Sequence, residues 1–216
     1  MHITGRTAHG PGSLEAAAAA VVAAGGECVT HVVDHSDASA IGALFDQVMA
    51  DEPEGVDLLV NNVYPAVVLL GDALRSGATK FWQQPPTAFA DINDVGLTAH
   101  YVASVHYAKA MVPRGRGLIV TVSSPAGCFY FFTAAYSTGK AAVDRMTKDF
   151  AHELHGTGLG AFVLYPGTCH SSGPRPLVLL CRRPRPVPLR SRVAPPLSLA
   201  QAWWPPRSFS SLPRRG

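Results

Sequence analysis

The amino-acid sequence predicts an α/β protein built on a doubly wound parallel sheet, and three observations lead to that fold class. Strand-like and helix-like segments alternate through most of residues 1–170. The strand-like segments are nearly continuous apolar runs, which is typical of parallel strands covered by helices on both faces. Polar residues and glycines follow these segments directly, at the sheet edge where proteins of this class bind ligands.

The first two strand-like segments flank a helix. Residues 2–6 have the character of a strand end, and residues 27–34 are rich in β-branched side chains. Between them, Ser13 can cap a helix over residues 14–24, and the glycine pair that follows would end it. These residues predict one strand–helix–strand unit.

The later elements follow the same alternation. Apolar residues recur at helical spacing in the helix-like segments and run almost uninterrupted in the strand-like ones. The expected elements are helices over 36–52, 87–111 and 135–155, strands over 55–62, 117–124 and 159–167, and an irregular segment over 63–86.

Charge divides the chain into two parts. Residues 1–170 contain nine Lys and Arg and fifteen Asp and Glu, whereas residues 171–216 contain nine Arg and no acid. Ten of those last 46 residues are proline, which opposes helices and central strands there. We therefore predict a folded domain over residues 1–170 and a disordered, Pro/Arg-rich tail over residues 171–216. The tail lacks the interleaved aromatic pattern of a nucleic-acid binder, so no nucleic-acid partner is expected.

The composition also bears on location. No run of about 18 apolar residues occurs, so no membrane span is expected. The first residues lack the apolar core of a secretory signal, and the four cysteines form no C-x-x-C pair. These features favour a reducing compartment and predict a cytoplasmic protein. The histidines at helical spacing, His152 and His155, have no third partner at metal-ligand spacing, so no metal site is expected.

Tyr136 and Lys140 lie four residues apart, on one face of the helix expected over residues 135–155. A tyrosine phenol is a poor acid–base catalyst at neutral pH because its ordinary pKa is about 10. A lysine cation one turn away favours the phenolate and lowers that pKa. Ser124 ends the strand over residues 117–124 and could hold a carbonyl oxygen while the tyrosine exchanges a proton with it.

The segments VDLLVNNVY, GLIVTVSSPAG, AAYSTGKAAVDRM and LYPG resemble the short-chain dehydrogenase/reductase family, and the resemblance covers residues 3–167. It implies a Rossmann-like fold, NAD(P)(H) as cofactor, and a catalytic serine, tyrosine and lysine. On this resemblance the chain is an oxidoreductase that transfers a hydride between NADP(H) and a small-molecule carbonyl or alcohol. The resemblance also implies a homo-oligomer as one form of assembly.

The resemblance assigns the catalytic roles. Tyr136 would be the acid/base, and Lys140 would lower its pKa and hold the nicotinamide ribose. Ser124 would bind the substrate carbonyl, with Ser123 as the alternative register. An asparagine of the preceding helix belongs to a proton relay in the family. In this chain the position that corresponds to the family's asparagine is occupied by Gly96. We therefore choose Asn93, which lies one helical turn earlier, for this role.

The resemblance also assigns residues to the cofactor. Asn61 would contact it, Asp34 would lie against the adenine, and Pro166 and Gly167 would lie by the nicotinamide. Arg6 resembles the basic residue that accommodates a 2′-phosphate, so NADP(H) is favoured over NAD(H). Tyr136 and Lys140 would complete the cofactor contacts.

The glycine-rich phosphate loop is the main departure from the family pattern. TGRTAHGPG at residues 4–12 is a near match, but its spacing is one residue too long and only three residues precede it. We interpret Gly10 and Gly12 as part of a loop after the family's second strand. The chain then lacks roughly 35 family residues, which include the first strand–helix unit. Its loss would leave two strand edges unpaired.

Two further departures concern the turn after residue 60 and the end of the chain. The family's N-N-A-G appears here as Asn61 to Tyr64, which makes that turn bulkier, and the sequence after about residue 168 no longer follows the family. These departures leave an alternative reading open, in which the chain is a truncated, catalytically incompetent family member that binds no cofactor.

Overall fold

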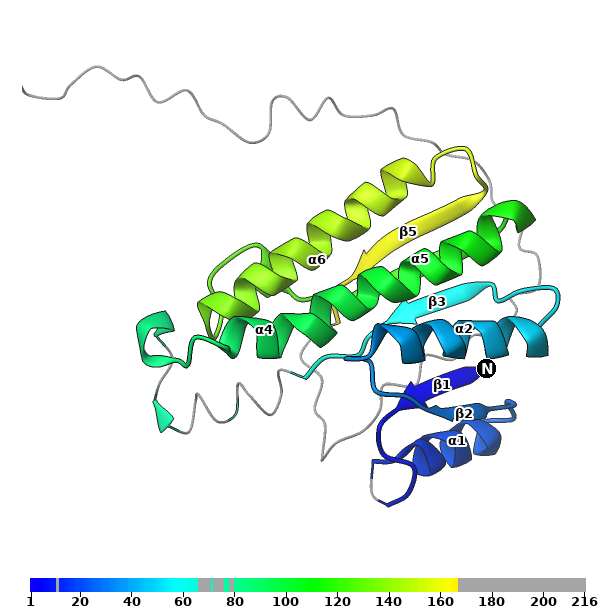
Figure 1. The fold of residues 1–216 in the computed structure, drawn as a ribbon, viewed down its shortest axis with the longest axis horizontal. Helices are drawn as coiled ribbons and strands as arrows, with labels where there is room; N and C mark the ends of the chain where they lie inside the picture. Colours follow the sequence, from blue (N-terminus) through cyan, green and yellow to red (C-terminus); the bar gives the residue numbers. More distant parts are fainter. Residues whose placement is uncertain (11, 66–70, 72–75, 78–79, 167–216) are drawn as a thin grey trace, which may run out of the picture. The chain divides into compact units, whose positions relative to one another are not determined.

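The chain is seen in a computed structural model that describes residues 1–10, 12–65, 71, 76–77 and 80–166 (Figure 1). All of these residues belong to one unit, which spans Met1–Arg182. The tail predicted over residues 171–216 lies outside the described residues, so its disorder stays a prediction.

Five strands pair in parallel, as predicted, and they divide into two sheets. β1 (His2–Gly5) pairs with β2 (Val29–Val32). In the second sheet, β4 (Gly117–Val122) lies between β3 (Leu58–Asn61) and β5 (Leu159–Leu164). Within the described residues no ladder joins β1 to β3. Within the described residues, each of these two strands therefore has one unpaired edge.

The helices begin at polar caps. α1 (Leu14–Ala23) begins after Ser13, and α6 (Ala134–Glu153) begins after Thr133. In both, the cap hydroxyl oxygen accepts a hydrogen bond from a backbone amide of the first turn, at 3.3 Å in α1 and 3.2 Å in α6. The other helical elements are α2 (Ala38–Asp51), α4 (Ala88–Asn93), α5 (Ala99–Met111) and the 3₁₀ turns η1 (Phe81–Gln83), η3 (Val112–Arg114) and η4 (Pro125–Gly127).

The helix expected over residues 87–111 is interrupted. A π-helical turn, η2 (Asp94–Thr98), joins α4 to α5. Turns of this kind occur frequently at functional sites. Gly96 lies in this turn against the ring of Tyr64, where a Cβ atom would overlap the ring. Only a residue without a side chain fits at position 96 while the Tyr64 ring keeps its place.

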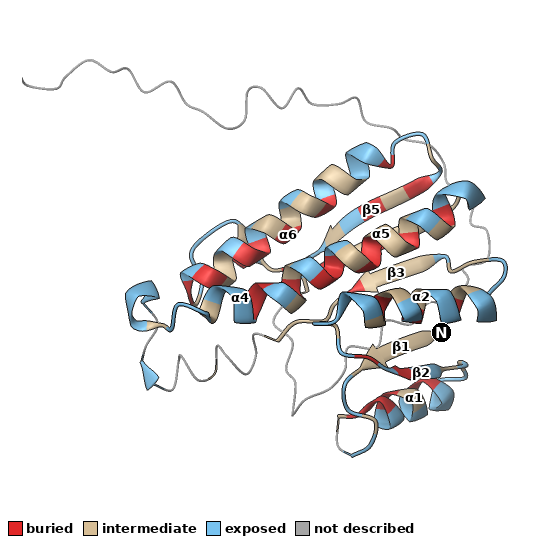
Figure 2. Cartoon of the chain, viewed as in Figure 1, coloured by how far each residue is buried: buried red, intermediate tan, exposed pale blue. Residues whose placement is uncertain are grey.

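The core lies mainly around β4, β5 and α5. Figure 2 shows buried positions along α5 and β5. Its largest cluster consists of Tyr107, Met111, Ile119, Leu154, Leu159 and Ala161. α2 packs against α5, α4 packs against α6, and α1 packs against β1 and β2. The two sheets differ in burial: Ile119 of β4 is 1% exposed, whereas Val32 of β2 is 65% exposed. None of the helices in the described part combines the length and apolar character that crossing a membrane requires.

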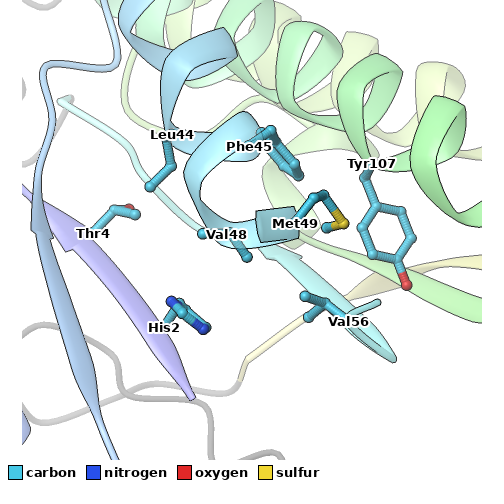
Figure 3. Close-up of a pocket in the computed structure, with 8 residues that line it drawn as sticks. All are labelled: His2, Thr4, Leu44, Phe45, Val48, Met49, Val56 and Tyr107. Carbon is cyan, nitrogen blue, oxygen red and sulfur yellow. The ribbon is translucent and has the colours of Figure 1, made fainter. Parts of the chain in front are cut away.

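A small cavity of about 90 Å³ lies beside β1 (Figure 3). Its lining residues are His2, Thr4, Leu44, Phe45, Val48, Met49, Val56 and Tyr107. None of the predicted site residues lines it, and it is smaller than the 300–1,000 Å³ typical of ligand pockets, on the order of the space left by one or two side chains. We therefore interpret it as incomplete packing where the two sheets divide.

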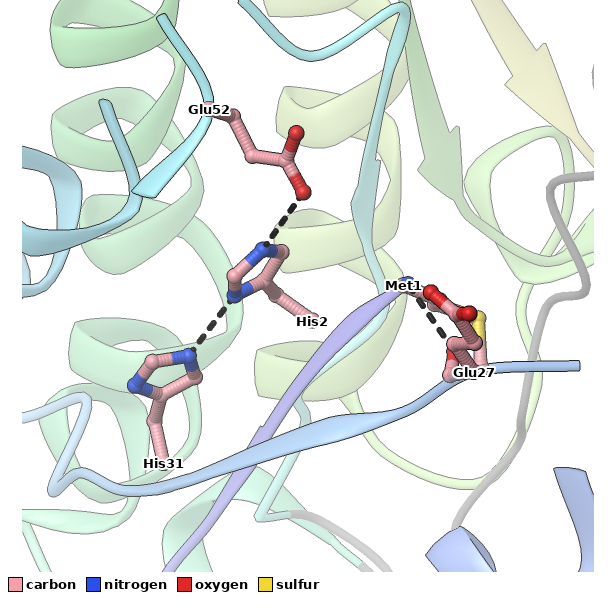
Figure 4. A network of polar contacts seen from close by, with 5 residues as sticks. All are labelled: Met1, His2, Glu27, His31 and Glu52. Atoms are coloured by element: carbon pink, nitrogen blue, oxygen red, sulfur yellow. Dashed lines mark hydrogen bonds and ion pairs between the residues drawn. The ribbon is translucent and has the colours of Figure 1, made fainter. Parts of the chain in front are cut away.

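Polar contacts hold the beginning of β1 to its surroundings (Figure 4). The amino group of Met1 donates to the Glu27 carbonyl oxygen at 3.0 Å. The imidazole of His2 lies between two partners, with Nδ1 2.9 Å from Nε2 of His31 and Nε2 3.3 Å from Oε1 of Glu52. Burial, followed by the neighbouring His2, lowers the pKa of His31. A hydrogen bond between two imidazoles requires one of them to be neutral, so acid opposes this contact.

Candidate active site

The two serines at the end of β4 have different surroundings. Ser123 is buried, and its hydroxyl donates to the backbone oxygen of Lys140 at 3.5 Å. Ser124 is half-buried and caps η4, where its Oγ accepts from the Ala126 amide at 3.2 Å. Accepting that bond leaves the hydroxyl hydrogen of Ser124 available to donate. The geometry therefore favours Ser124 over Ser123 as the residue that could hold a substrate oxygen.

Helix α6 carries Tyr136 and Lys140 one turn apart. Tyr136 is half-buried, whereas Lys140 is only 5% exposed. The Nζ of Lys140 donates to the Val122 carbonyl oxygen at 3.2 Å, at the end of β4. Burial lowers the pKa of Lys140 to about 8, and the Asp144 carboxylate acts in the opposite direction. Within the described residues, the contacts of this ammonium are with Val122 and the Tyr64 ring, and none is with the Tyr136 phenol.

Asn93 joins α4 to the same face of α6. Its side chain is buried, and its Nδ2 donates to the backbone oxygens of Phe89 at 2.9 Å and Ala135 at 3.3 Å. Its Oδ1 lies directly against Gly139, where a Cβ atom would overlap it, and is buried without a partner in the described structure. Gly96, the alternative register, has no side chain to contribute. The geometry therefore favours Asn93, and it reveals Gly139 as a residue that lets Asn93 reach the helix.

Tyr64 is the residue in this cluster that the sequence did not assign. Its ring lies edge-on to that of Tyr136, with 5.7 Å between centroids, and the Lys140 Nζ sits 3.9 Å from its centroid. Its hydroxyl is buried without a hydrogen-bond partner in the described structure, and burial raises its pKa. The only sequence signal was the bulky residue in place of the last glycine of N-N-A-G.

A run of aromatic residues leads from the surface to Tyr136. Phe132 has a φ of 62°, a left-handed conformation that is costly for a bulky side chain. The hydroxyl of Ser137 holds the preceding residue by accepting from the Phe131 amide at 3.0 Å and donating to its carbonyl oxygen at 2.9 Å. The Phe132 ring then lies edge-on to Tyr136 at 5.6 Å. Phe131 and Tyr130 remain exposed beside it.

The residues assigned to the cofactor are less closely grouped. Asn61 is buried at the end of β3, where its Nδ2 donates to Ser104 Oγ at 2.9 Å and to the His100 carbonyl oxygen at 3.5 Å. That side chain anchors β3 to α5. Pro166 is half-buried just beyond β5, and Gly167 lies outside the described residues.

Arg6 and Asp34 follow the ends of β1 and β2, and both are exposed. The Asp34 carboxylate accepts from the Ser36 amide at 2.9 Å and from the Ser36 hydroxyl at 2.8 Å. These bonds lower the pKa of Asp34, and the nearby Arg6 adds a smaller effect in the same direction. Arg6 and Asp34 therefore place one positive and one negative charge after the ends of the paired strands β1 and β2.

Comparison with known proteins identifies the family. A sequence model of the short chain dehydrogenases matches residues 3–176. The chain therefore belongs to the short-chain dehydrogenase/reductase family, whose members are oxidoreductases with a Rossmann-like fold. This confirms the fold class and the family resemblance expected from the sequence.

Individual relatives agree with this assignment. Dehydrogenase/reductase SDR family member 1 of Mus musculus is 42% identical over 167 residues, which cover 77% of this chain and 51% of that protein. The chain thus spans about half the length of this relative. A metagenomic short-chain oxidoreductase in complex with NADP aligns with a TM-score of 0.65 and 28% identity, covering 78% of this chain and 71% of that one. NAD⁺-bound xylitol dehydrogenase aligns with a TM-score of 0.62 and 27% identity, covering 71% and 56%.

Proposed function

We propose that the chain carries the site of an NADP(H)-dependent carbonyl reductase or alcohol dehydrogenase, with Tyr136 as its acid/base. One observation carries the proposal: Tyr136 and Lys140 lie one turn apart on α6, and the buried Lys140 ammonium donates to the Val122 carbonyl oxygen at the end of β4, two residues before Ser124. The substrate is proposed to be a small molecule, and a cytoplasmic location and a homo-oligomeric assembly complete the proposal.

Each proposed catalytic residue has a separate role in the reduction of the carbonyl group. The Ser124 hydroxyl donates to the substrate oxygen, and Tyr136 transfers a proton to that oxygen during reduction. The nicotinamide, when bound, supplies the hydride that the carbonyl carbon receives. The C=O π bond is thereby replaced by one C–H and one O–H bond, and oxidation of the alcohol is the reverse. Asn93 offers its unpaired Oδ1 as an acceptor, which can hold a relay water by a hydrogen bond that the water donates.

The cofactor preference is supported by the charge at the sheet edge. Arg6 follows β1 and is exposed, so its guanidinium can pair with a 2′-phosphate, a contact that NAD lacks. We propose Tyr136, Lys140 and Pro166 for the nicotinamide and ribose end of the cofactor, and Arg6 and Asp34 for the adenine end. The pyrophosphate would need backbone amides from a glycine loop, and residues 4–12 do not match the family spacing.

Aromatic side chains lie near the proposed acid/base, Tyr136, where a substrate would bind. Phe131 and Tyr130 are exposed next to Phe132, and Phe132 contacts Tyr136. Exposed rings that adjoin a reacting group provide apolar contact area for a ligand. We therefore propose that apolar, ring-containing carbonyl compounds are better substrates than small hydrophilic ones.

The test is a fluorescence titration of the 216-residue chain with NADPH, alongside a thermal melt. Saturable binding with a raised melting temperature supports the proposal. Consumption of NADPH with a carbonyl substrate, abolished in Tyr136→Phe with no change in melting temperature, then assigns the acid/base. Turnover that survives unchanged in Tyr136→Phe contradicts the assignment.

A second function is favoured by the division of the sheet. β1 and β3 each have an unpaired edge, and a cavity lies beside β1. A chain with this defect could keep the family's core without binding cofactor. If the chain melts cooperatively but does not bind NADPH, it is the catalytically incompetent form and not the reductase.

A further inference from the structure

We propose that Tyr64 is a positioning residue that holds the Lys140 ammonium by a cation–π contact. This inference deepens the proposed function, because it concerns the lysine on which the proposed acid/base chemistry depends. It rests on three observations around Tyr64. The face of its ring lies over a buried cation, a glycine without a side chain lies against the ring, and its hydroxyl has no hydrogen-bond partner among the described residues.

The first observation is the geometry of the cation. The Lys140 Nζ lies 3.9 Å from the centroid of the Tyr64 ring. A ring centroid within about 6 Å attracts an ammonium through the negative face of the aromatic system, and the attraction grows when water is excluded. Lys140 is buried, and Val122 provides the carbonyl oxygen to which it donates. The ring therefore occupies one side of an ammonium that has lost most of its water.

The second observation is the fit of the ring. Gly96 lies in the π turn η2 directly against the ring, and no side chain could be added there without displacing it. The ring also contacts Tyr136, whose ring lies edge-on with 5.7 Å between the two centroids. Tyr64 thus touches both residues of the Tyr–Lys pair and is held between α6 and the π turn. A ring fixed in this way gives the lysine side chain one position relative to Tyr136.

The third observation allows the role of the Tyr64 ring to be tested independently of the Tyr64 hydroxyl. The Tyr64 oxygen is buried and makes no hydrogen bond within the described residues. Its removal in Tyr64→Phe loses no bond and keeps the aromatic face. Replacement by leucine removes the face while retaining an apolar side chain. The two variants therefore differ chiefly in the interaction that the proposal invokes.

The electrostatic consequence can be measured at Lys140 itself. Burial disfavours the ammonium, and the ring favours it, so loss of the ring should lower the pH at which the lysine loses its proton. The expected decrease is roughly 0.5–1 in pH, from the usual strength of such contacts and the free energy of one pKa unit. Loss of packing alone would admit water to the ammonium, and that would raise the same midpoint.

The experiment follows acetylation of Lys140 by acetic anhydride as a function of pH, with peptide-resolved mass spectrometry of the 216-residue chain. Exposed Lys109 and Lys148 serve as internal references. We expect the same midpoint in the unmodified chain and Tyr64→Phe, and a lower one in Tyr64→Leu. An unchanged or higher midpoint in Tyr64→Leu overturns the proposal.

A second series covers the case in which Tyr64→Leu does not fold. Phenylalanine, 4-fluorophenylalanine and 3,4,5-trifluorophenylalanine at position 64 have nearly the same shape, but fluorine progressively weakens the negative ring face. The Lys140 midpoint should fall stepwise along this series, and equal midpoints would contradict the cation–π contact. Neither series requires cofactor or turnover, so an inactive chain refutes the proposed function without deciding the role of Tyr64.

Discussion

The two sheets of this molecule hold their functional residues in different ways. In the region around β3, β4 and β5, buried contacts fix the side chains: Lys140 reaches a strand carbonyl, and Asn93 reaches the backbone of α6. In the region of β1, β2 and α1, the candidate residues Arg6 and Asp34 are exposed. The proposed catalytic geometry therefore depends on packing within one sheet and its helices, whereas the proposed adenine-side contacts depend on a smaller, more exposed sheet.

The largest expected difference is in stability. Ile119→Ala removes a fully buried side chain from β4 and should reduce the free energy of unfolding by about 2–5 kcal/mol. Val32→Ala in β2 should change it by less than about 0.5 kcal/mol because Val32 is mostly exposed. Urea denaturation followed by far-ultraviolet circular dichroism measures both. Similar losses in the two variants would remove the distinction between the regions.

The pH dependence of stability should be the next largest effect. Burial lowers the pKa of His100 to about 4, and the Val63 carbonyl oxygen, 2.9 Å from its Nε2, opposes that shift only partly. The unfolded chain therefore binds this proton at a higher pH than the folded chain does. Stability should be complete above pH of about 6.5 and decrease as the pH falls toward 4, by up to about 3 kcal/mol.

Thermal melts between pH 7.5 and 4.5 measure this dependence, and His100→Gln should flatten it. His31 in the β1–β2 region also has a lowered pKa, so His31→Gln should flatten the same curve, over the range below about 6.5. Hydrogen exchange at low pH shows which region opens first. Melting temperatures that do not depend on pH in this range would contradict both assignments.

A medium effect is expected at the contact between α4 and α6. Gly139→Ala places a methyl group where Asn93 Oδ1 lies, so the asparagine must move. We expect a loss of about 1–3 kcal/mol in stability, as for other overpacked sites. Any turnover should fall at least roughly tenfold, because misplacement of Asn93, the proposed relay residue, affects the reacting geometry.

Thr138→Ala is the matched control for Gly139→Ala, since Thr138 is exposed on the same helix. Its stability should stay within about 0.5 kcal/mol of the unmodified chain. Both variants are compared by urea denaturation and by NADPH consumption. A Gly139→Ala chain as stable and active as Thr138→Ala would show that Asn93 has no fixed position.

The smallest effects are expected at the helix caps. Thr133→Ala and Ser13→Ala each remove a hydroxyl that caps a first turn, and each should cost about 1 kcal/mol. The consequences should differ by region: hydrogen exchange should accelerate at the start of α6 in one variant and at the start of α1 in the other. NADPH consumption should fall only with Thr133→Ala, because Tyr136 lies in that first turn.

Local sequence patterns were enough to predict much of the fold. Apolar runs predicted β3, β4 and β5, and β-branched residues predicted β2. Ser13 was predicted to cap α1, and its hydroxyl does accept a hydrogen bond from the first turn. The candidate pair Tyr136 and Lys140 was also found from the sequence, because a four-residue spacing places two side chains on one helical face whatever the surrounding structure. The family resemblance then assigned their catalytic roles.

Only the tertiary structure decided which other residues reach that face. Gly96 lies against the ring of Tyr64, and Gly139 lies against the side-chain amide of Asn93. The two residues of each pair are distant in sequence, so no local pattern could have predicted these contacts. The division of the strands into two sheets is also a matter of long-range pairing. Spacing along the chain determines the direction of a side chain within its own element, but the packing of separate elements determines what that side chain meets.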